Sequence, residues 1–401
     1  MWNFEVILAI TFVIFLSSFL YYKRDKLHIQ KIVFPLIFMI LYKSKFGIAL
    51  MDKIANKYRE YVKLFGYISA GLGFIGMFFV TYSIIILMVK LVTAPEAAEA
   101  GVVPVLPFTS IPGLGYLSFT TWLIAIFVLA VVHEFSHGVV ARAHNLPVKS
   151  SGFAFLSVLL PIIPAAFVEP DEKKMSKKED IVQYSVLAAG PISNVVLALL
   201  ILLISSFFLV PLEAKILEPE GFTFDVTNES LPAYQGGLRS GYTIVSYNGI
   251  TTHDYQYFLE QMSYCSEPGK EITLSTKDQS FTITPVIHPE NPEKGYIGVA
   301  NIQNKFKIKD EYKDLWWTSV VIWVKDLFKW LFWLNLFIGL ANLLPLGIVD
   351  GGQMLRIMLS KIMKNQHHAM KLWGIIAWGI LIILLFALVV NYTGNPFALL
   401  Q

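Results

Sequence analysis

His133-Glu134-Phe135-Ser136-His137 lies inside an apolar stretch, residues 119–141, that is long enough to cross a bilayer as a helix. In a helix the two histidines are four residues apart and share one face, so both imidazoles can reach one metal ion at about 2.0–2.1 Å. Polar side chains at bilayer depth are costly unless they coordinate an ion or face a wet cavity. The stretch therefore predicts a metal site inside a membrane, with Zn²⁺ as the expected ion.

Glu134 follows the first histidine, where it can take a proton from a water molecule on the metal, the part of a general base in this motif. The alternative is a chance match on an amphipathic helix. Only 8 of the 401 residues are histidines, and the flanks 127–132 and 139–141 are apolar, which disfavours a solvated surface helix. The metal site is therefore the better interpretation.

The composition, with 55% hydrophobic and 15% charged residues, is that of a membrane protein. The net charge of +3 is small, and the positive residues lie in loops beside apolar runs. Charge therefore indicates orientation in a bilayer and gives no sign of nucleic-acid binding. The single cysteine, Cys265, cannot form an internal disulfide. Residues 4–22 lack a basic start and a small-residue cleavage site, so we expect a retained anchor.

Six apolar runs have about the length that one bilayer crossing needs, namely 4–22, 65–91, 119–141, 181–210, 330–346 and 372–391. A seventh run, 32–42, is short and contains Pro35, so we expect a re-entrant or interfacial element there. The predicted fold class is a polytopic α-helical membrane protein with about six transmembrane helices.

Lysine and arginine cluster in the loops 23–64, 142–180 and 356–371, which predicts that these loops are cytoplasmic. The loop 92–118 has neither residue and is expected outside, together with both termini. The polar insertion 211–314 is then external. It contains an amphipathic stretch, 255–262, and the strand-like segments 272–275, 281–286 and 296–299. These features predict a compact α+β domain. The tryptophan-rich segment 312–329 is typical of an interfacial helix.

A catalytic zinc normally takes three protein ligands, and the histidine motif supplies two. His144 lies about 10 Å further along a straight helix, too far to share the ion. A better candidate is Asp350 in Asn342-Leu343-Leu344-Pro345-Leu346-Gly347-Ile348-Val349-Asp350-Gly351-Gly352, where Pro345 and Gly347 break the apolar run. The alternative is that Asp350 only caps the next helix. Together with the histidine motif, the ligand interpretation is favoured.

The two motifs, H-E-x-x-H and N-x-x-P-x-x-x-x-D-G, resemble those of the site-2 protease family, the intramembrane zinc metalloproteases of regulated intramembrane proteolysis. Gly190-Pro191-Ile192-Ser193-Asn194 is similar to the G-P-x-x-N element of that family. The order of the motifs also agrees, and the resemblance covers about 119–360. Val349 stands where the family often has Leu before the aspartate.

The resemblance implies roles for individual residues. His133, His137 and Asp350 would bind one catalytic Zn²⁺, and Glu134 would activate the water. Asn194 and Asn342 would line the site and hydrogen-bond the substrate backbone or the oxyanion, although hydrogen bonds between helices are the alternative. The substrate-binding group implied by the two motifs is Gly190, Pro191, Asn194, Asn342 and Pro345.

The segment 150–168, apolar and interrupted by Pro161 and Pro164, resembles the membrane-inserted β-hairpin with which the family holds an unwound substrate strand. The insertion resembles a PDZ domain over 230–244 and the turn Asn248-Gly249, with Gly236 and Tyr242 departing from the usual Ala and Asp. Residues 295–299 resemble a carboxylate-binding loop or, equally, an ordinary closing strand.

The expected organisation is an N-terminal span with a re-entrant or interfacial extension, 1–64, similar to that of archaeal-type members. Two halves of a membrane core, 65–210 and 315–401, would flank the PDZ-like domain, 211–314. The expected function is hydrolysis of peptide bonds within transmembrane segments of pre-trimmed membrane proteins. The alternatives are a membrane-anchored metalloprotease for soluble or misfolded substrates, and a non-catalytic PDZ-bearing scaffold.

The expected partners are the lipid bilayer, a transmembrane helix of a substrate, and a peptide or trimmed substrate tail at the PDZ-like domain, with no nucleic acid. The expected location is the cell membrane, with several crossings, the PDZ-like domain outside and the active site toward the cytoplasmic side.

Overall fold

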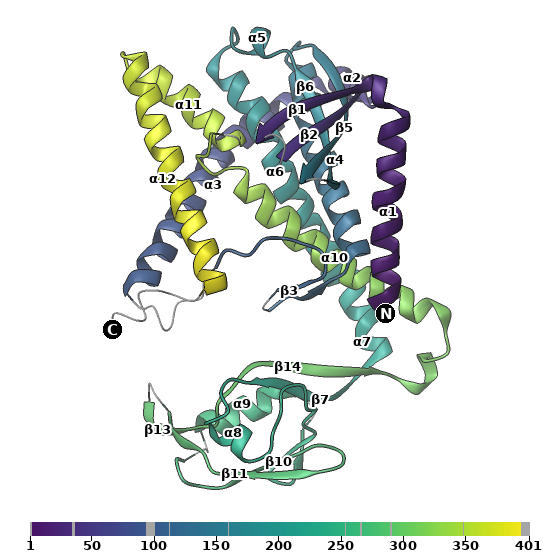
Figure 1. The fold of residues 1–401 in the computed structure, drawn as a ribbon, viewed down its shortest axis with the longest axis vertical. Helices are drawn as coiled ribbons and strands as arrows, with labels where there is room; N and C mark the ends of the chain where they lie inside the picture. Colours follow the sequence, from purple (N-terminus) through teal and green to yellow (C-terminus); the bar gives the residue numbers. More distant parts are fainter. Residues whose placement is uncertain are drawn as a thin grey trace. The chain divides into compact units, whose positions relative to one another are not determined.

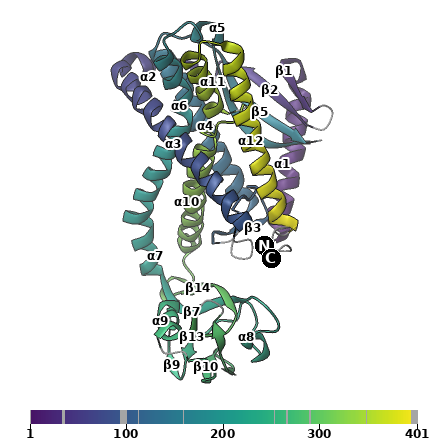
Figure 2. The same ribbon diagram turned by 90° about the vertical axis from the view of Figure 1, so that its left-hand side faces the viewer.

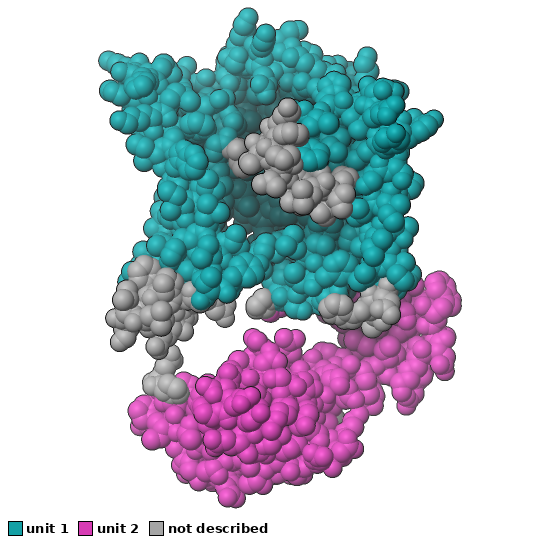
Figure 3. Space-filling view, viewed as in Figure 1, with its two compact units in different colours: residues 1–111, 116–204, 326–401 teal, residues 112–115, 205–325 magenta. Residues whose placement is uncertain are grey.

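A computed structural model of the chain describes residues 2–33, 37–93, 101–111, 113–158, 160–252, 254–264, 267–288, 291–347 and 349–393. The chain divides into two compact units, coloured separately in Figure 3. Unit 1 comprises residues 1–111, 116–204 and 326–401, and unit 2 comprises 112–115 and 205–325. The predicted insertion, 211–314, lies within unit 2. Cys265, Ile348 and Pro35 lie outside the described residues.

Five helices of the described chain are long and apolar enough to cross a membrane, and they coincide with five of the six predicted spans. The fourth of them continues through a π-helical stretch, η2 (Ser205–Leu209), into α7 (Val210–Ile216). The helices of these five spans are α1 (Trp2–Tyr22), α3 (Arg59–Thr93), α4 (Phe119–Ala143), α6 (Asp180–Ile204) and α12 (Gln366–Thr393).

The predicted span 330–346 is not among these five. Its residues 330–341 belong to α10 (Trp316–Ala341), a single helix that also takes up most of the predicted interfacial segment. Lys325, Asp326 and Lys329 interrupt the apolar character of α10, and the helix ends before Pro345, which cannot continue it. The apolar part of α10 is therefore shorter than the sequence suggests.

A four-stranded antiparallel sheet of unit 1 has the order β1-β2-β5-β6. Strands β5 (Val148–Val158) and β6 (Leu160–Pro170) form the hairpin expected over 150–168, and its place in the membrane stays a prediction. Strands β1 (Leu27–Val33) and β2 (Ile37–Ser44) occupy the run expected to be re-entrant, and β2 pairs with β5. The strand β6 is left at one edge of this sheet (Figure 1).

The helices α3, α4 and α6 pack closely because small residues face one another. A Cβ added at Gly66 of α3 would lie 3.0 Å from Val140 of α4 and 3.1 Å from Ser185 of α6. A buried cluster that includes Ala188 and Met354 packs α11 (Asp350–Ile362) against α6 and α12. These contacts fix three segments of distant sequence beside one another, and Figure 2 shows α3, α4 and α6 from the side.

Unit 2 is built around a core that includes Phe222, Ile244 and Phe258. The long strands β7 (Leu217–Val226) and β14 (Val299–Ile308) pair antiparallel. A second sheet has the order β11-β10-β8-β9, from β8 (Ser246–Tyr247), β9 (Ile250–Thr251), β10 (Ile272–Ser275) and β11 (Ser280–Ile283). The other elements are α8 (Pro232–Gln235), α9 (Tyr255–Tyr264), β12 (Val286–His288) and β13 (Asn291–Tyr296).

Several sequence expectations for unit 2 match its local structure. The amphipathic stretch 255–262 lies in α9, and β10 has the predicted bounds. Asn248 and Gly249 have φ values of 48° and 80°, as a tight turn between β8 and β9 requires. The likeness to a PDZ domain stays a prediction.

Short elements complete the described chain. They are η1 (Arg24–Lys26), α2 (Ile48–Lys57), β3 (Thr109–Ile111), β4 (Gly115–Leu117), α5 (Glu172–Met175) and η3 (Asp310–Tyr312).

Candidate metal centre

The helix α4 carries His133 and His137 on one face. It begins after Ser118, whose hydroxyl accepts a hydrogen bond from the backbone N–H of Thr121, an N-cap that fixes the start of the helix. Both imidazoles are buried, and their ring centroids are 4.7 Å apart. The two rings therefore point to a common place beside the helix, as the spacing predicts.

Asp350 reaches the same place from the far end of the chain. Its Oδ2 atom lies 3.2 Å from Nε2 of His133 and 3.5 Å from Nε2 of His137. Among the described residues, these three form a group that could hold a metal ion. Ligand atoms placed tetrahedrally at the usual Zn²⁺ distances are about 3.3 Å apart. Both separations are close to that value, so Asp350 lies at a distance from each histidine that suits a third zinc ligand.

The turn between α10 and α11 places the carboxylate of Asp350. Pro345 is buried in this turn, and the backbone N–H of Gly351 donates to the carbonyl of Asn342 at 2.8 Å. A Cβ at Gly351 would lie 2.6 Å from the carbonyl oxygen of Leu344. Glycine is therefore required after the aspartate because the helix start presses against the turn.

Gly190 of α6 leaves the space into which the two imidazoles point. A Cβ at this position would lie 2.8 Å from Nε2 of His133 and 2.7 Å from Cε1 of His137. The next residue, Pro191, lies inside the helix, and its carbonyl faces Gly339 of α10. The missing side chain at Gly190 keeps the space beside the ligand atoms open, which fits an ion.

The hydrogen bonds behind the histidines leave both Nε2 atoms free to bind a metal. Nδ1 of His137 lies 2.6 Å from the carbonyl oxygen of Val186, which only accepts, so Nδ1 carries the proton. Nδ1 of His133 lies 3.3 Å from Nδ2 of Asn194, whose Oδ1 is buried without a partner among the described residues. Turning this amide by 180° pairs Oδ1 with a protonated Nδ1, as in metal-binding histidines.

Glu134 lies beside the histidines and is held by the sheet. Its Oε2 accepts a hydrogen bond of 2.9 Å from the backbone N–H of Val168 on β6. One carboxylate oxygen is thus tied to the hairpin. The other oxygen is available to accept a proton.

The two asparagines predicted to line the site have different surroundings. Asn194 is completely buried and contacts His133, so its geometry favours positioning that ligand. Asn342 is half-buried, and its Nδ2 donates to the carbonyl of Ile338 at 3.0 Å. A contact of either side chain with substrate stays a prediction.

Sequence reasoning missed the backbone groups of the site. The N–H of Val168 and the carbonyl of Val186 each hold a functional side chain, yet a backbone group leaves no residue-type signal. His144 is not part of the metal group, as the helix geometry predicts, and its ring lies 5.5 Å from that of Tyr67.

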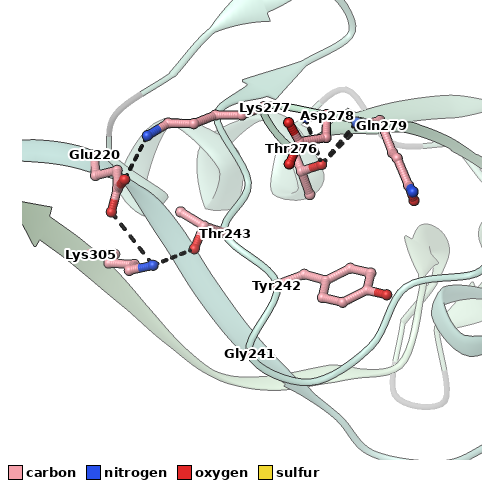
Figure 4. A pocket seen from close by; sticks show the side chains of 9 residues that line it. All are labelled: Glu220, Gly241, Tyr242, Thr243, Thr276, Lys277, Asp278, Gln279 and Lys305. Carbon is pink, nitrogen blue, oxygen red and sulfur yellow. Dashed lines mark hydrogen bonds and ion pairs between the residues drawn. The ribbon is translucent and has the colours of Figure 1, made fainter.

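A cavity of about 480 Å³ lies one helical turn from the metal group, since Gln353 lines it and follows Asp350 by three residues. Unit 2 has a separate cavity of about 420 Å³, shown in Figure 4. Glu220 in that cavity pairs with Lys277 at 2.6 Å and Lys305 at 3.5 Å, and Lys277 holds the pKa of this carboxyl below its usual range. Three of its charged side chains therefore pair with one another.

Comparison with known proteins agrees with this geometry. Residues 121–387 match the family described as "Peptidase family M50". An uncharacterized protein of Methanocaldococcus jannaschii is 29% identical over 355 residues, which cover 86% of this chain and 83% of the relative. A "Putative zinc metalloprotease" of Clostridium acetobutylicum is 23% identical over 208 residues, covering 47% of this chain and 59% of the relative. The family match spans well over half of the chain and includes all three motifs. The chain therefore belongs to peptidase family M50, and this membership implies the function of an intramembrane metalloprotease.

Proposed function

We propose that the protein is a zinc-dependent endopeptidase that cleaves transmembrane segments of membrane proteins already trimmed by another protease. The observation that carries this proposal is the convergence of His133, His137 and Asp350 around the open space beside Gly190. Two neutral imidazoles and a carboxylate are a donor set that suits Zn²⁺ and leaves a fourth position open. When bound there, Zn²⁺ would polarise the scissile carbonyl and make a water molecule more acidic.

Glu134 supplies the proton transfers. Its free carboxylate oxygen accepts the proton of the attacking water, and the same group can return a proton to the leaving amine. The hydrogen bond from Val168 fixes the carboxylate, so the proton acceptor is already oriented before substrate enters. His133 and His137 are held through their Nδ1 atoms, which keeps the reacting groups in fixed positions relative to one another.

The surroundings favour a membrane-embedded substrate in an extended form. The site lies on α4, one of the helices long and apolar enough to cross a membrane. A peptide bond inside an intact helix is shielded by its own turns, so the substrate must unwind before cleavage. The edge of β6 offers backbone groups to such an unwound strand. The face of unit 1 seen in Figure 3 is also hollowed, which is consistent with room for a substrate.

Unit 2 is assigned to selection of the substrate. A PDZ-like domain would bind a peptide or the trimmed tail of a substrate. Within unit 2 the described residues form no group of three possible metal ligands. Removing the unit is therefore expected to leave cleavage of a short, pre-trimmed helix intact and to alter the choice between full-length and trimmed substrates.

The decisive experiment compares two variants of the full chain in lipid nanodiscs. Glu134→Gln should retain zinc and lose turnover, because the ligands remain and the proton acceptor is gone. Asp350→Asn should lose both zinc and turnover while the fold persists. Asp180→Asn is a matched control, since Asp180 also opens a helix but pairs with Lys361.

Zinc is measured by mass spectrometry of the metal, and cleavage by the mass of the fragments of a single-span reporter. Full zinc occupancy with normal cleavage in Asp350→Asn would refute the assignment of this site. Cleavage of a soluble unfolded protein, with the membrane reporter left intact, would instead favour a protease for soluble or misfolded substrates. If the biological role of the protein needs zinc in neither the wild type nor any variant, the non-catalytic scaffold would be favoured.

A further inference from the structure

The N-terminal strands β1 and β2 belong to the same sheet as β6, whose backbone contacts the carboxylate of Glu134. Strand β2 lies outside residues 121–387, the part of the chain that matches the family. It pairs with β5 along its length, from Ile37 opposite Val158 to Ser44 opposite Ser151. This pairing occupies one side of β5 and leaves β6 on the other, so β6 shares its partner strand with a segment that the family match does not include.

The edge of β6 faces Glu134. The backbone N–H of Val168 donates to Glu134, so it points away from β5. Backbone groups on one side of a strand recur at every second residue. Pro164 and Pro170 fall on this same outward side, where a missing N–H breaks no bond of the sheet. Val168 is thus an outward donor of β6 that holds the carboxylate.

A charged contact ties β2 directly to this part of β6. Nζ of Lys43 lies 2.8 Å from Oε2 of Glu169, the residue that follows Val168. The hydroxyl of Ser150 on β5 donates to the same oxygen at 2.5 Å. These two donors hold the pKa of the Glu169 carboxyl below its usual range. Both partners of the ion pair are partly buried, so the contact restrains β6 across three strands.

We propose that the N-terminal hairpin β1–β2 positions the catalytic base, with Lys43 as the positioning residue. Lys43 holds Glu169, and the backbone of the neighbouring residue, Val168, holds the carboxylate of Glu134. The inference rests on the proposed function, because it assigns Glu134 as the base. It adds a requirement that the three motifs do not contain: an N-terminal segment that aligns the base with the metal centre.

Amide exchange of Val168 tests the contact without any assay of activity. In the full chain in nanodiscs, Glu134→Ala removes the acceptor and sets the upper limit of exchange at this amide. Lys43→Met should raise the exchange rate of Val168 by about five-fold, the effect expected from losing a partly exposed ion pair. Lys43→Arg should keep the wild-type rate. Lys149→Met is the matched control, since Lys149 lies on β5, pairs with Asp171 and acts on Glu169 only as a nearby charge, without the direct contact that Lys43 makes.

Kinetics then test whether the contact matters for catalysis. Lys43→Met should lower kcat by about five-fold, leave KM within about two-fold, and leave zinc content unchanged. A general loss of folding would lower zinc content as well. Lys43→Arg should restore kcat, and the double variant Lys43→Met/Glu169→Gln should lose no more than Lys43→Met, because both act through one contact.

Wild-type exchange of Val168 in Lys43→Met, or equal losses of kcat in Lys43→Met and Lys149→Met, would overturn the inference. If the wild-type protein cleaves no membrane reporter, the proposed function fails. The exchange of Val168 then decides by itself whether Lys43 holds the Glu134 contact.

Discussion

The backbone N–H of Gly351 donates to the backbone carbonyl of Asn342 at 2.8 Å, and this bond closes the turn that carries Asp350 to the histidines. The two residues are the first and last positions of the N-x-x-P-x-x-x-x-D-G motif. The ends of the motif are thus joined through the backbone, while Pro345 is buried between them. Much of this motif serves to place one carboxylate.

Gly351→Ala should weaken zinc binding by about 10- to 100-fold, the range for changes that displace a metal ligand without removing it. The added methyl group would press on the carbonyls of Leu343 and Leu344 and move Asp350. Competition with a chelator measures the affinity. Gly379→Ala on α12 is the control, because a Cβ there meets no atom within 4 Å. Equal affinities for the two variants would show that the turn tolerates a side chain.

Gly190→Ala should abolish zinc binding and leave the helices folded. Its methyl group would occupy the space between the two imidazoles, close to Nε2 of His133. Bound zinc per protein and helical circular dichroism are the measurements. Gly71→Ala on α3 has open space around its Cβ and should bind zinc normally. A zinc-loaded Gly190→Ala protein would place the ion elsewhere.

Asn194→Leu and Asn194→Asp separate hydrogen bonding from packing. The leucine variant removes the acceptor for Nδ1–H of His133, so zinc affinity should fall by about 10- to 100-fold. The aspartate variant keeps an oxygen at this place and should retain affinity much closer to wild type. Chelator competition under the same conditions tests both. If the two variants are equally impaired, Asn194 does not act as an acceptor.

His144 should make the protein less stable in mild acid. Burial, with Lys63, Lys178 and Arg59 nearby, lowers the pKa of His144 below its usual range, although Glu60 opposes this. The unfolded chain therefore takes up a proton at a pH where the folded chain does not. The stabilising contribution of neutral His144 is present above about pH 6.5, the usual pKa of histidine, and is lost as the pH falls below that value.

The melting temperature of the wild-type protein should accordingly decline between pH 7 and pH 5. His144→Asn keeps a polar side chain that does not titrate in this range, so part of the decline should disappear. Thermal unfolding followed at both pH values in one detergent gives the comparison. An identical decline in the variant would assign the effect to other groups.

Cysteine labelling tests the predicted orientation. With Cys265→Ser as background, a cysteine at Ser280 of unit 2 should react with an impermeant reagent from outside. A cysteine at Ser176 should react only after the membrane is opened, since its loop is rich in lysine. Both serines are exposed, so access depends on the side of the membrane alone. Labelling of Ser176→Cys in intact cells would reverse the topology.

The sequence predicts the parts of this protein that have a clear periodicity or a chemical motif. Five apolar runs form helices, and the histidines and the aspartate of two distant motifs meet. The apolar run of 32–42 did not predict strands, because a short hydrophobic run fits a strand as well as a helical element, and its interfacial or re-entrant place stays a prediction. Only its pairing with β5 decides between them, and that pairing joins segments far apart in the chain.

The span predicted at 330–346 is not among the five long apolar helices, for a different physical reason. Hydrophobicity continues past Ala341, but α10 ends there, and Pro345 lacks the N–H that would continue the helical hydrogen bonds. Hydropathy averaged over a window of sequence does not show where α10 ends. The contacts of Val168 and Val186 were also beyond prediction, since any residue type could supply them.

The pairing of β7 with β14 joins two strands of unit 2 that lie far apart in the chain, with Leu217 opposite Ile308. The two ends of the segment 217–308 therefore lie side by side, whatever is folded between them. Closing a chain between two adjacent points costs an entropy that grows only slowly with the length of the enclosed segment. Such an insertion can be lengthened, shortened or exchanged in evolution without rethreading the helices that carry the metal ligands, so selectivity can change while the chemistry is inherited intact.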